Sequence, residues 1–532
     1  MRTRWPAGLT LLVVLCGHAT AAPHPSDVAQ AVARPPGAPE ASGVIMRSLR
    51  LHPANAKDPH DTMRALKAFH VTRLAWTYIN DKAFIDRVRA SGRVFGGAAA
   101  APSYIRDDKP DDWFEQVVVL DLAGKPIIAP WKRTWKRTLW GCINNPEFER
   151  GYLAWLRQYI DAGAQVMQRD EPTANHFACR WGGCFCKHCI AGFRPYLARH
   201  TTPEERRKLG IADVATFDVR AYFLARGAPV GDAFARYEGG RMKELFEAFQ
   251  LAATVAFHQR TRRALDAYAR RHVPVSCNNG ARRWSVVEKQ FDWLFGELAF
   301  RHATAVQVHH IFANARRHGQ VQVVTMPKKG DRTDLPGWQR RTRRAIATVY
   351  ACGGLCMVPW DVYMPRDAPR YFGTPEQYAD LFALVRAARE LLDGYAYAGA
   401  VGKGIPCDLY GQAGPPVRLP ADRPDLFACL RAKLGRPKAP VVVHLVDWSD
   451  QPKPAVVTLD SKRIATEGPV RAVLVTPTPY DKAGHVKAEQ TGDYAPLRTE
   501  TPLRIEPDGR IRLPALRPWG ILVVRAGGAQ KP

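Results

Sequence analysis

Long apolar runs are scarce in this sequence, and none is long enough to cross a membrane as a helix. The sequence also has no Gly-rich phosphate loop after an early apolar segment, which disfavours a nucleotide-binding open sheet. The usual nucleic-acid-binding motifs are missing too, so we expect no nucleic-acid partner. With a hydrophobic content of 46%, the chain fits an ordinary globular protein.

Acidic residues are too few to balance the basic ones, because 77 Lys and Arg stand against 50 Asp and Glu. The formal net charge of +27 favours an anionic partner such as an acidic glycan or the cell envelope. No dense Lys/Arg block occurs, however, and charges dispersed over the surface would give the same total. Both interpretations stay open, and the sequence leaves the oligomeric state unknown.

The N-terminus has the pattern of an export signal. Arg2 and Arg4 precede the apolar run "AGLTLLVVLCG", and "ATA" then offers small residues for cleavage. Leu15 before Cys16 is too bulky for a lipoprotein signal. We therefore expect a signal peptide over residues 1–22 and a periplasmic or secreted protein, with a Pro- and Ala-rich flexible linker over 23–41.

From residue 42 to about 400, short apolar strands alternate with amphipathic helices. Asn145 and Pro146, for example, fit the N-cap and first position of a helix. Eight strand–helix units predict a (β/α)8 TIM barrel, with a doubly wound open sheet as the alternative. The expected strands cover 44–52, 72–79, 93–104, 164–172, 273–280, 292–298, 321–329 and 355–363.

Beyond residue 400 the pattern changes to short β-type runs with Pro, Gly and Asp breaks and no clear helices. We expect a transition segment over 401–436 and an all-β sandwich domain over 437–532. Carbohydrate binding by this second domain is one option, and simple packing on the barrel is the other.

Acids, amides and aromatic residues follow the ends of the predicted strands, where TIM barrels carry their active sites. Such a set suits a carbohydrate substrate, because aromatic faces stack on sugar rings and paired carboxyls hydrolyse glycosidic bonds. The alternative is that several of these acids only form ion pairs. The residues are Trp76, Tyr78, Asp170, Glu171, Asn278, Asn279, Glu297, Lys328, Lys329, Trp360, Asp361 and Tyr363.

Three cysteines are closely spaced as Cys184-x-Cys186-x-x-Cys189, which is typical of a tetrahedral zinc site. The fourth ligand could be Cys142 or the nearer Cys179. Disulfides are the alternative in an exported protein. The other cysteines have no metal spacing; Cys277, Cys352 and Cys356 fit the barrel core, and a Cys407–Cys429 disulfide is an option.

The order "CINNPEF", helix, strand ending in an acidic pair and "CFCKHCIAGFRPYL" resembles the zinc-bearing β-galactosidases of glycoside hydrolase family 42. The resemblance covers about residues 138–198. It implies that Glu171 is the general acid/base and that Asp170 stands where the family has Asn. It also implies a structural zinc held by Cys142, Cys184, Cys186 and Cys189, with no catalytic cofactor.

The sequence departs from that family at the seventh strand, which ends "TMPKKG" where the family has its nucleophilic Glu. The candidates for the second carboxylate are Glu297, Asp361 and Asp170, and Glu297 is the preferred one. A carboxyl separation of about 6.5–9.5 Å would favour inversion, and about 5–5.5 Å retention.

We therefore predict a glycoside hydrolase with Glu171 and Glu297 as its catalytic pair. One alternative is a non-catalytic glycan-binding barrel, which the missing strand-seven acid allows. Another is a zinc hydrolase, for which "RHATAVQVHHIF" offers His302, His309 and His310. The helical periodicity of that segment favours ordinary core and surface roles for these histidines.

Overall fold

The computed structural model describes most of the chain. The predicted signal peptide lies outside the described part except for Ala22, and so do His302, Lys328, Lys329 and Tyr363. The described residues are 22–49, 61–104, 111–134, 138–299, 303–326, 334–362, 372–464 and 470–526. Among them, no helix combines the length and the apolar character that a membrane crossing needs.

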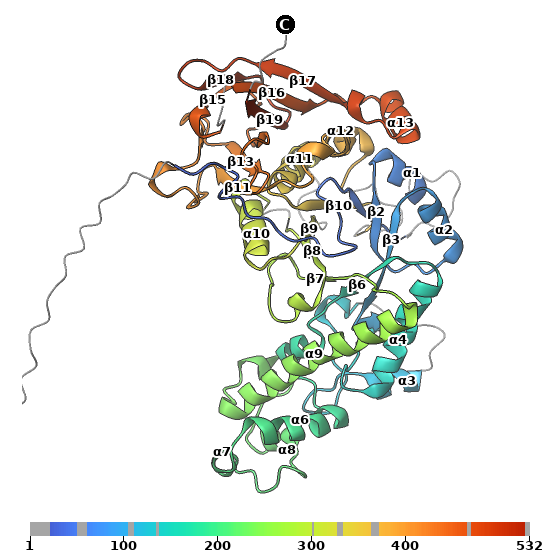
Figure 1. Cartoon of the computed structure of the whole chain (residues 1–532). Coiled ribbons are helices and arrows are strands. Elements are labelled where there is room, and N and C mark those ends of the chain that lie inside the picture. The colour runs from blue at the N-terminus through green and yellow to red at the C-terminus, as the bar shows by residue number, and fades with distance from the viewer. Residues whose placement is uncertain are drawn as a thin grey trace, which may run out of the picture.

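The centre of the molecule is a closed barrel of eight parallel strands (Figure 1). The first strand pairs with both the second and the last, which closes the sheet and confirms the predicted (β/α)8 fold. Every predicted barrel strand has a counterpart. The strands are β1 (Ile45–Arg47), β2 (Arg73–Thr77), β3 (Val94–Ala100), β6 (Val166–Asp170), β7 (Val275–Asn278), β8 (Trp293–Glu297), β9 (Gln322–Thr325) and β10 (Leu355–Pro359).

Helices surround the barrel, and local sequence signals fix where several of them begin. The Asn145 side chain accepts a hydrogen bond from the Glu147 amide at the start of α4 (Pro146–Asp161), with Pro146 at the first position as predicted. The other covering helices are α1 (Thr62–Ala68), α2 (Lys82–Ala90), α9 (Gly240–Ala269), α10 (Ala305–Arg317), α11 (Leu335–Ala351) and α12 (Pro375–Ala387).

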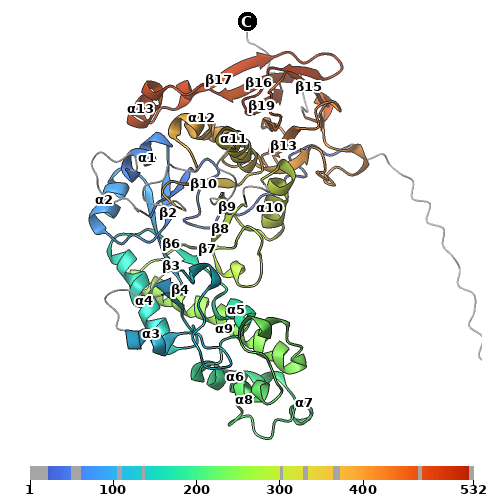
Figure 2. The ribbon, with the colours of Figure 1, turned by 180° about the vertical axis from the view of Figure 1, so that it is seen from behind.

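Insertions after β3 and β6 build a lobe with a hydrophobic core of its own, centred on residues such as Phe185, Phe193 and Phe246. In both views the lobe lies across the barrel from the C-terminal sheets (Figures 1 and 2). Within the lobe, a turn brings Leu120 and Pro126 together in an isolated antiparallel bridge. The lobe contains β4 (Pro102–Tyr104), α3 (Asp111–Val117), β5 (Thr138–Trp140), α5 (Ala174–Ala178), α6 (Lys187–His200), α7 (Pro203–Lys208) and α8 (Val219–Leu224).

The C-terminal region contains a six-stranded and a three-stranded antiparallel sheet. The larger sheet begins at residue 396, so it takes in strands from the predicted transition segment 401–436 as well as from 437–532. A helix, α13 (Lys482–Thr491), interrupts the all-β pattern expected here. The sheets are β11 (Ala396–Val401), β13 (Leu426–Ala432), β14 (Val441–Asp447), β19 (Trp519–Ala526), β16 (Val470–Pro477) and β17 (Arg498–Leu503), and β12 (Val417–Arg418), β15 (Ala455–Leu459) and β18 (Arg510–Leu513).

Residues 23–41, predicted as a flexible linker, instead pack along the C-terminal region. The Gln30 amide donates to the Tyr397 carbonyl at 2.7 Å, and the Gly435 amide donates to the Ser26 carbonyl at 3.1 Å. Ala29 belongs to the core between the two sheets. Composition alone favoured a loose segment, but partners far along the chain bind its backbone.

Candidate active site and metal centre

Asp170 lies at the carboxyl end of β6 and gathers three hydrogen-bond donors. The Tyr78 hydroxyl donates to it at 2.7 Å, and the Asn278 side-chain amide donates at 3.0 Å. The backbone amide of Glu171 donates to the same carboxyl at 3.0 Å. Tyr78 follows β2 and Asn278 ends β7, so three predicted strand-end residues meet as the barrel geometry requires.

Glu171 follows Asp170 with a φ of 51°, a backbone conformation that non-glycine residues rarely adopt. Desolvation by the surrounding protein and the charge of Asp170 raise the pKa of Glu171 to about 8. Glu297 adds to the rise, while Arg283 and Lys132 oppose it. At neutral pH this carboxyl therefore keeps its proton, which is the state that a general acid needs.

Glu297 ends β8 and is close enough for its charge to raise the pKa of Glu171. It also lines a cavity of about 350 Å³ together with Trp284 and His310. The cavity lies between the segment after β7 and helix α10. Glu297 thus borders a space large enough for part of a ligand and lies near Glu171, which comes from a different strand.

Some predicted substrate-binding residues lie in the interior instead. Trp76 is 1% exposed in the barrel core, where a register shift in β2 and its φ of 55° turn the ring inward under Arg47. Trp360 is 5% exposed and packs edge-on against Phe69. Asn279 is fully buried and exchanges hydrogen bonds with Gln322.

Asp361 is also buried, at 1% exposure, at the end of β10. The Ser48 hydroxyl donates to it at 2.9 Å and the Leu49 amide at 2.7 Å. These bonds tie the segment after β1 to the neighbouring strand end. Both carboxyl oxygens of Asp361 therefore accept a hydrogen bond from the segment after β1.

The sequence interpretation missed two cations beside the acids, Lys132 and Arg283. Burial lowers the pKa of Lys132, and the charges of Asp170 and Glu171 raise it, so this ammonium lies near both carboxyls. Arg283 has the largest lowering effect on the pKa of Glu171. Lys132 belongs to the insertion after β3 and Arg283 to the segment after β7, where no strand pattern signals them.

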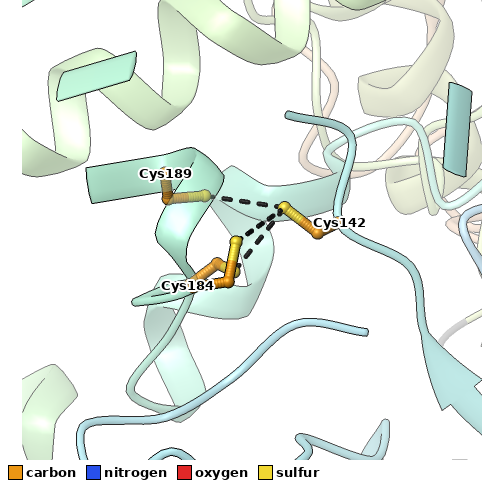
Figure 3. A group of neighbouring side chains, drawn as sticks. Cys142, Cys184 and Cys189 are labelled. Atoms are coloured by element: carbon orange, nitrogen blue, oxygen red, sulfur yellow. Dashed lines mark hydrogen bonds between the residues drawn. The ribbon is translucent and has the colours of Figure 1, made fainter. Parts of the chain in front are cut away.

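Four buried cysteines converge in the lobe, as the sequence predicted (Figure 3). The sulfur of Cys142 is 3.6 Å from those of Cys184, Cys186 and Cys189. All four sulfurs lie within 4.8 Å of one another, so they form a group that could hold a metal ion. The separations are far longer than a disulfide bond of about 2 Å, and all four are free thiols.

Amide groups surround this cysteine cluster. The side-chain nitrogen of Asn175 donates to the sulfurs of Cys142 and Cys189, and that of Asn144 donates to Cys189. N–H groups aimed at sulfur stabilise thiolates, the form that binds metal. Cys179 is outside the cluster: its thiol donates to the Asn175 carbonyl, and burial raises its pKa.

The remaining cysteines and histidines do not form a second metal group within the described residues. His309 is hydrogen-bonded to the Tyr397 hydroxyl at 2.9 Å, and His310 is on the exposed side of α10. The core positions predicted for Cys277, Cys352 and Cys356 are confirmed. Cys407 and Cys429 are free thiols rather than a disulfide.

The curated relatives that match this sequence cover about half of the chain. No protein-family model matches it, so family 42 is not supported specifically. An α-agarase of Alteromonas agarilytica is 24% identical over 282 residues, which cover 49% of this chain and 19% of that protein. An α-agarase of Thalassotalea agarivorans is 25% identical over 283 residues with the same coverage. The match thus spans about a fifth of these relatives' length.

A solved structure extends the comparison to the whole fold. The cycloisomaltooligosaccharide glucanotransferase of Paenibacillus sp., in complex with cycloisomaltoheptaose, has a TM-score of 0.54 and 10% identity. The alignment covers 91% of this chain and 85% of that one. At this identity the likeness shows the shared barrel architecture.

Proposed function

We propose that this protein is an exported glycoside hydrolase that cleaves a polysaccharide. The observation that carries the proposal is the environment of Glu171, whose pKa of about 8 leaves it protonated beside the acceptor Asp170 and within the field of Glu297. A protonated carboxyl with a second carboxyl nearby is the arrangement that glycosidic bond cleavage uses.

Each residue then has a distinct task. Glu171 gives its proton to the oxygen of the departing sugar, and Glu297 acts on the opposite side as base or nucleophile. Asp170, held by Tyr78 and Asn278, orients the sugar at the cleavage point. Lys132 and Arg283 keep the pKa of Glu171 from rising further, so the proton remains transferable.

The substrate class that the relatives favour is an agar-type galactan, since both matched proteins carry the name α-agarase. An anionic derivative of such a polymer also suits the site, because Lys132 and Arg283 supply positive charge beside the acids. Binding of a sulfated or carboxylated glycan should then weaken with added salt more than binding of neutral agarose.

The four cysteines fit a structural zinc ion. Four buried sulfurs at these separations match a closed tetrahedral thiolate site, and a closed site has no position for a reacting water. Cys142, Cys184, Cys186 and Cys189 would hold the ion, which would cross-link the segment before α4 to the segment after β6. The proton transfers are carried by the carboxyls alone.

Glu171→Gln in the full chain tests the acid. Hydrolysis of agarose should fall by about 10²–10⁴-fold, because Gln cannot donate the proton. An activated aryl glycoside should suffer much less, since its leaving group needs little protonation, whereas Glu297→Gln should impair both substrates. Glu147→Gln, which removes an exposed carboxyl paired with Arg150, is the matched control.

Full activity of a folded Glu171→Gln protein on the polysaccharide would refute the proposed acid. Tight glycan binding by the wild-type protein without turnover would instead favour a non-catalytic glycan-binding barrel. The end of β9 favours that alternative, because Thr325 and Met326 stand where a nucleophilic acid was expected. A screen against neutral, amino and uronic glycans separates the two functions.

A further inference from the structure

A cluster of aromatic rings lies in the lobe beside the acids. Trp131 has its ring centroid 5.5 Å from Trp181, 5.9 Å from Trp140 and 6.2 Å from Phe177. Phe177 and Trp181 are themselves 4.9 Å apart. These four residues are called the aromatic platform below.

The platform begins at the carboxyl ends of the barrel strands. Trp140 on β5 pairs with Pro102 on β4, two residues beyond Ala100, and Ala100 is in register with Asp170. Trp131 directly precedes Lys132, whose ammonium lies near Asp170 and Glu171. Two parts of the chain, β5 with Trp140 and the segment with Trp131, therefore place the platform near Asp170 and Glu171.

Arg283 joins the platform to the acid on the other side. Its guanidinium carbon is 5.1 Å from the centre of the Phe177 ring, and its charge lowers the pKa of Glu171. Arg180 approaches Phe177 at 5.0 Å. Guanidinium groups that flank aromatic rings offer hydrogen-bond donors to a ligand lying on those rings.

Exposure differs sharply within the platform. Trp140 is fully buried, whereas Trp131 is 43% exposed despite its contacts with three other rings. A tryptophan needed only for the lobe core would gain more from complete burial. The neighbouring rings hold the exposed indole in a fixed orientation, which lowers the entropy cost of binding a ligand there.

We propose that the aromatic platform is a sugar-binding subsite in which a pyranose ring of the substrate stacks on Trp131. This inference rests on the proposed function, because it takes the Glu171 region as the point of cleavage. The exposed indole offers an apolar face to the C–H groups of the pyranose ring. Arg180 and Arg283, which flank Phe177, would donate hydrogen bonds to the hydroxyl groups of the sugar. The platform thus adds affinity for polymeric substrates that extend beyond the cleaved bond.

Binding to the full chain carrying Glu171→Gln, which prevents turnover, tests the subsite. Hexasaccharides prepared from agarose, carrageenan and dextran are titrated by calorimetry. Adding Trp131→Ala should raise the Kd of the bound hexasaccharide by about fivefold or more, while Trp131→Tyr should retain most of the affinity. Tyr268→Ala is the matched control, because Tyr268 is 42% exposed at the far end of α9.

Steady-state kinetics distinguish a binding role of Trp131 from a purely structural one. In the otherwise wild-type protein, Trp131→Ala should raise KM for the polysaccharide with little change in kcat. An aryl monoglycoside, too short to reach the platform, should be cleaved as before. Thermal melting of each variant shows whether a loss of affinity follows a loss of folded protein.

Each outcome decides the proposal. Unchanged affinity after Trp131→Ala, or no binding of any of the three hexasaccharides to the parent, would overturn the subsite. Turnover that depends on Glu171 but not on Trp131 would also overturn it and leave the hydrolase proposal standing. Binding that depends on Trp131 in a protein without turnover would support the subsite and refute hydrolysis.

Discussion

Some neighbouring groups raise the pKa of Glu171 and others lower it, and the pH dependence of activity tests the result. Its pKa is about 8, so the carboxyl is protonated below that pH and loses its proton above it. We predict that kcat/KM falls on the alkaline side with an apparent pKa near 8. Because Arg283 lowers the pKa of Glu171, Arg283→Gln should move this limb to higher pH. A limb that stays fixed would show that another group controls it.

At the residue scale, the predicted strand ends meet, but the cations and the exposed indole that come from insertions were missed. Asp170, Glu171, Asn278 and Glu297 end parallel strands, and barrel topology brings such ends together. Lys132, Arg283 and Trp131 come from insertions whose path depends on packing that no local periodicity encodes. Trp76 was misplaced because an irregularity in β2 turns its side chain into the core.

At the scale of elements, the cysteine cluster joins the insertion after β3 to the insertion after β6. The two insertions also share hydrogen bonds, such as the one that the Phe185 amide donates to the Leu120 carbonyl at 2.8 Å. Compact spacing along the chain predicted the three cysteines around the start of α6, and the resemblance supplied Cys142. The geometry then separated Cys142 from its rival Cys179, which lies in the same lobe core but donates its thiol to a backbone carbonyl.

Metal removal should therefore act on stability before it acts on chemistry. We predict one zinc per chain, and that Cys186→Ser loses the ion and lowers the free energy of unfolding, because closed zinc sites contribute directly to folding. Elemental analysis and chemical denaturation measure the two effects. Cys179→Ser, a buried cysteine outside the cluster, should keep the metal. Metal-free native protein of unchanged stability would contradict the zinc site.

Helix α13, which the β-type pattern concealed, docks on the barrel through His485. His485 Nδ1 is 2.7 Å from Nε2 of the buried His70, and its ring lies 4.6 Å from Tyr480. Glu489 on the same helix bonds His70, Arg93 and Tyr494. Burial and His70 lower the pKa of His485 to about 4, although Asp380 and Asp481 act in the opposite direction.

This contact should weaken in acid. The unfolded chain takes up a proton at His485 below pH about 6.5, whereas the folded chain resists until about pH 4. We predict that the free energy of unfolding falls between these values, and that His485→Gln removes on the order of 1 kcal/mol of that fall. Denaturation across this pH range measures it, with the exposed His310→Gln as control. An identical slope in both variants would refute the assignment.

At the scale of the whole molecule, the barrel and the larger C-terminal sheet share one hydrophobic core. Residues along β14 alternate, with Val442 and Val446 in the barrel-side cluster and Val441, Val443 and Leu445 facing the smaller sheet. The sequence predicted two domains because its texture changes near residue 400. It could not predict that the first strands after that point complete a sheet that packs on α11, since this depends on contacts distant in the chain.

A shared core implies that the two regions unfold together. Trp519 on β19 is fully buried and stacks on Tyr350 of α11, with ring centroids 6.2 Å apart and an interplanar angle of 16°. We predict that Trp519→Ala costs about 3–5 kcal/mol, because it leaves a large cavity between sheet and helix. The midpoint temperatures of thermal unfolding, followed by enzymatic activity and by far-UV circular dichroism, should then fall by the same amount. Leu434→Ala, at a side chain that is 55% exposed, should leave both midpoints unchanged. A barrel that keeps its own midpoint while the sheet melts earlier would show that the two regions are energetically independent.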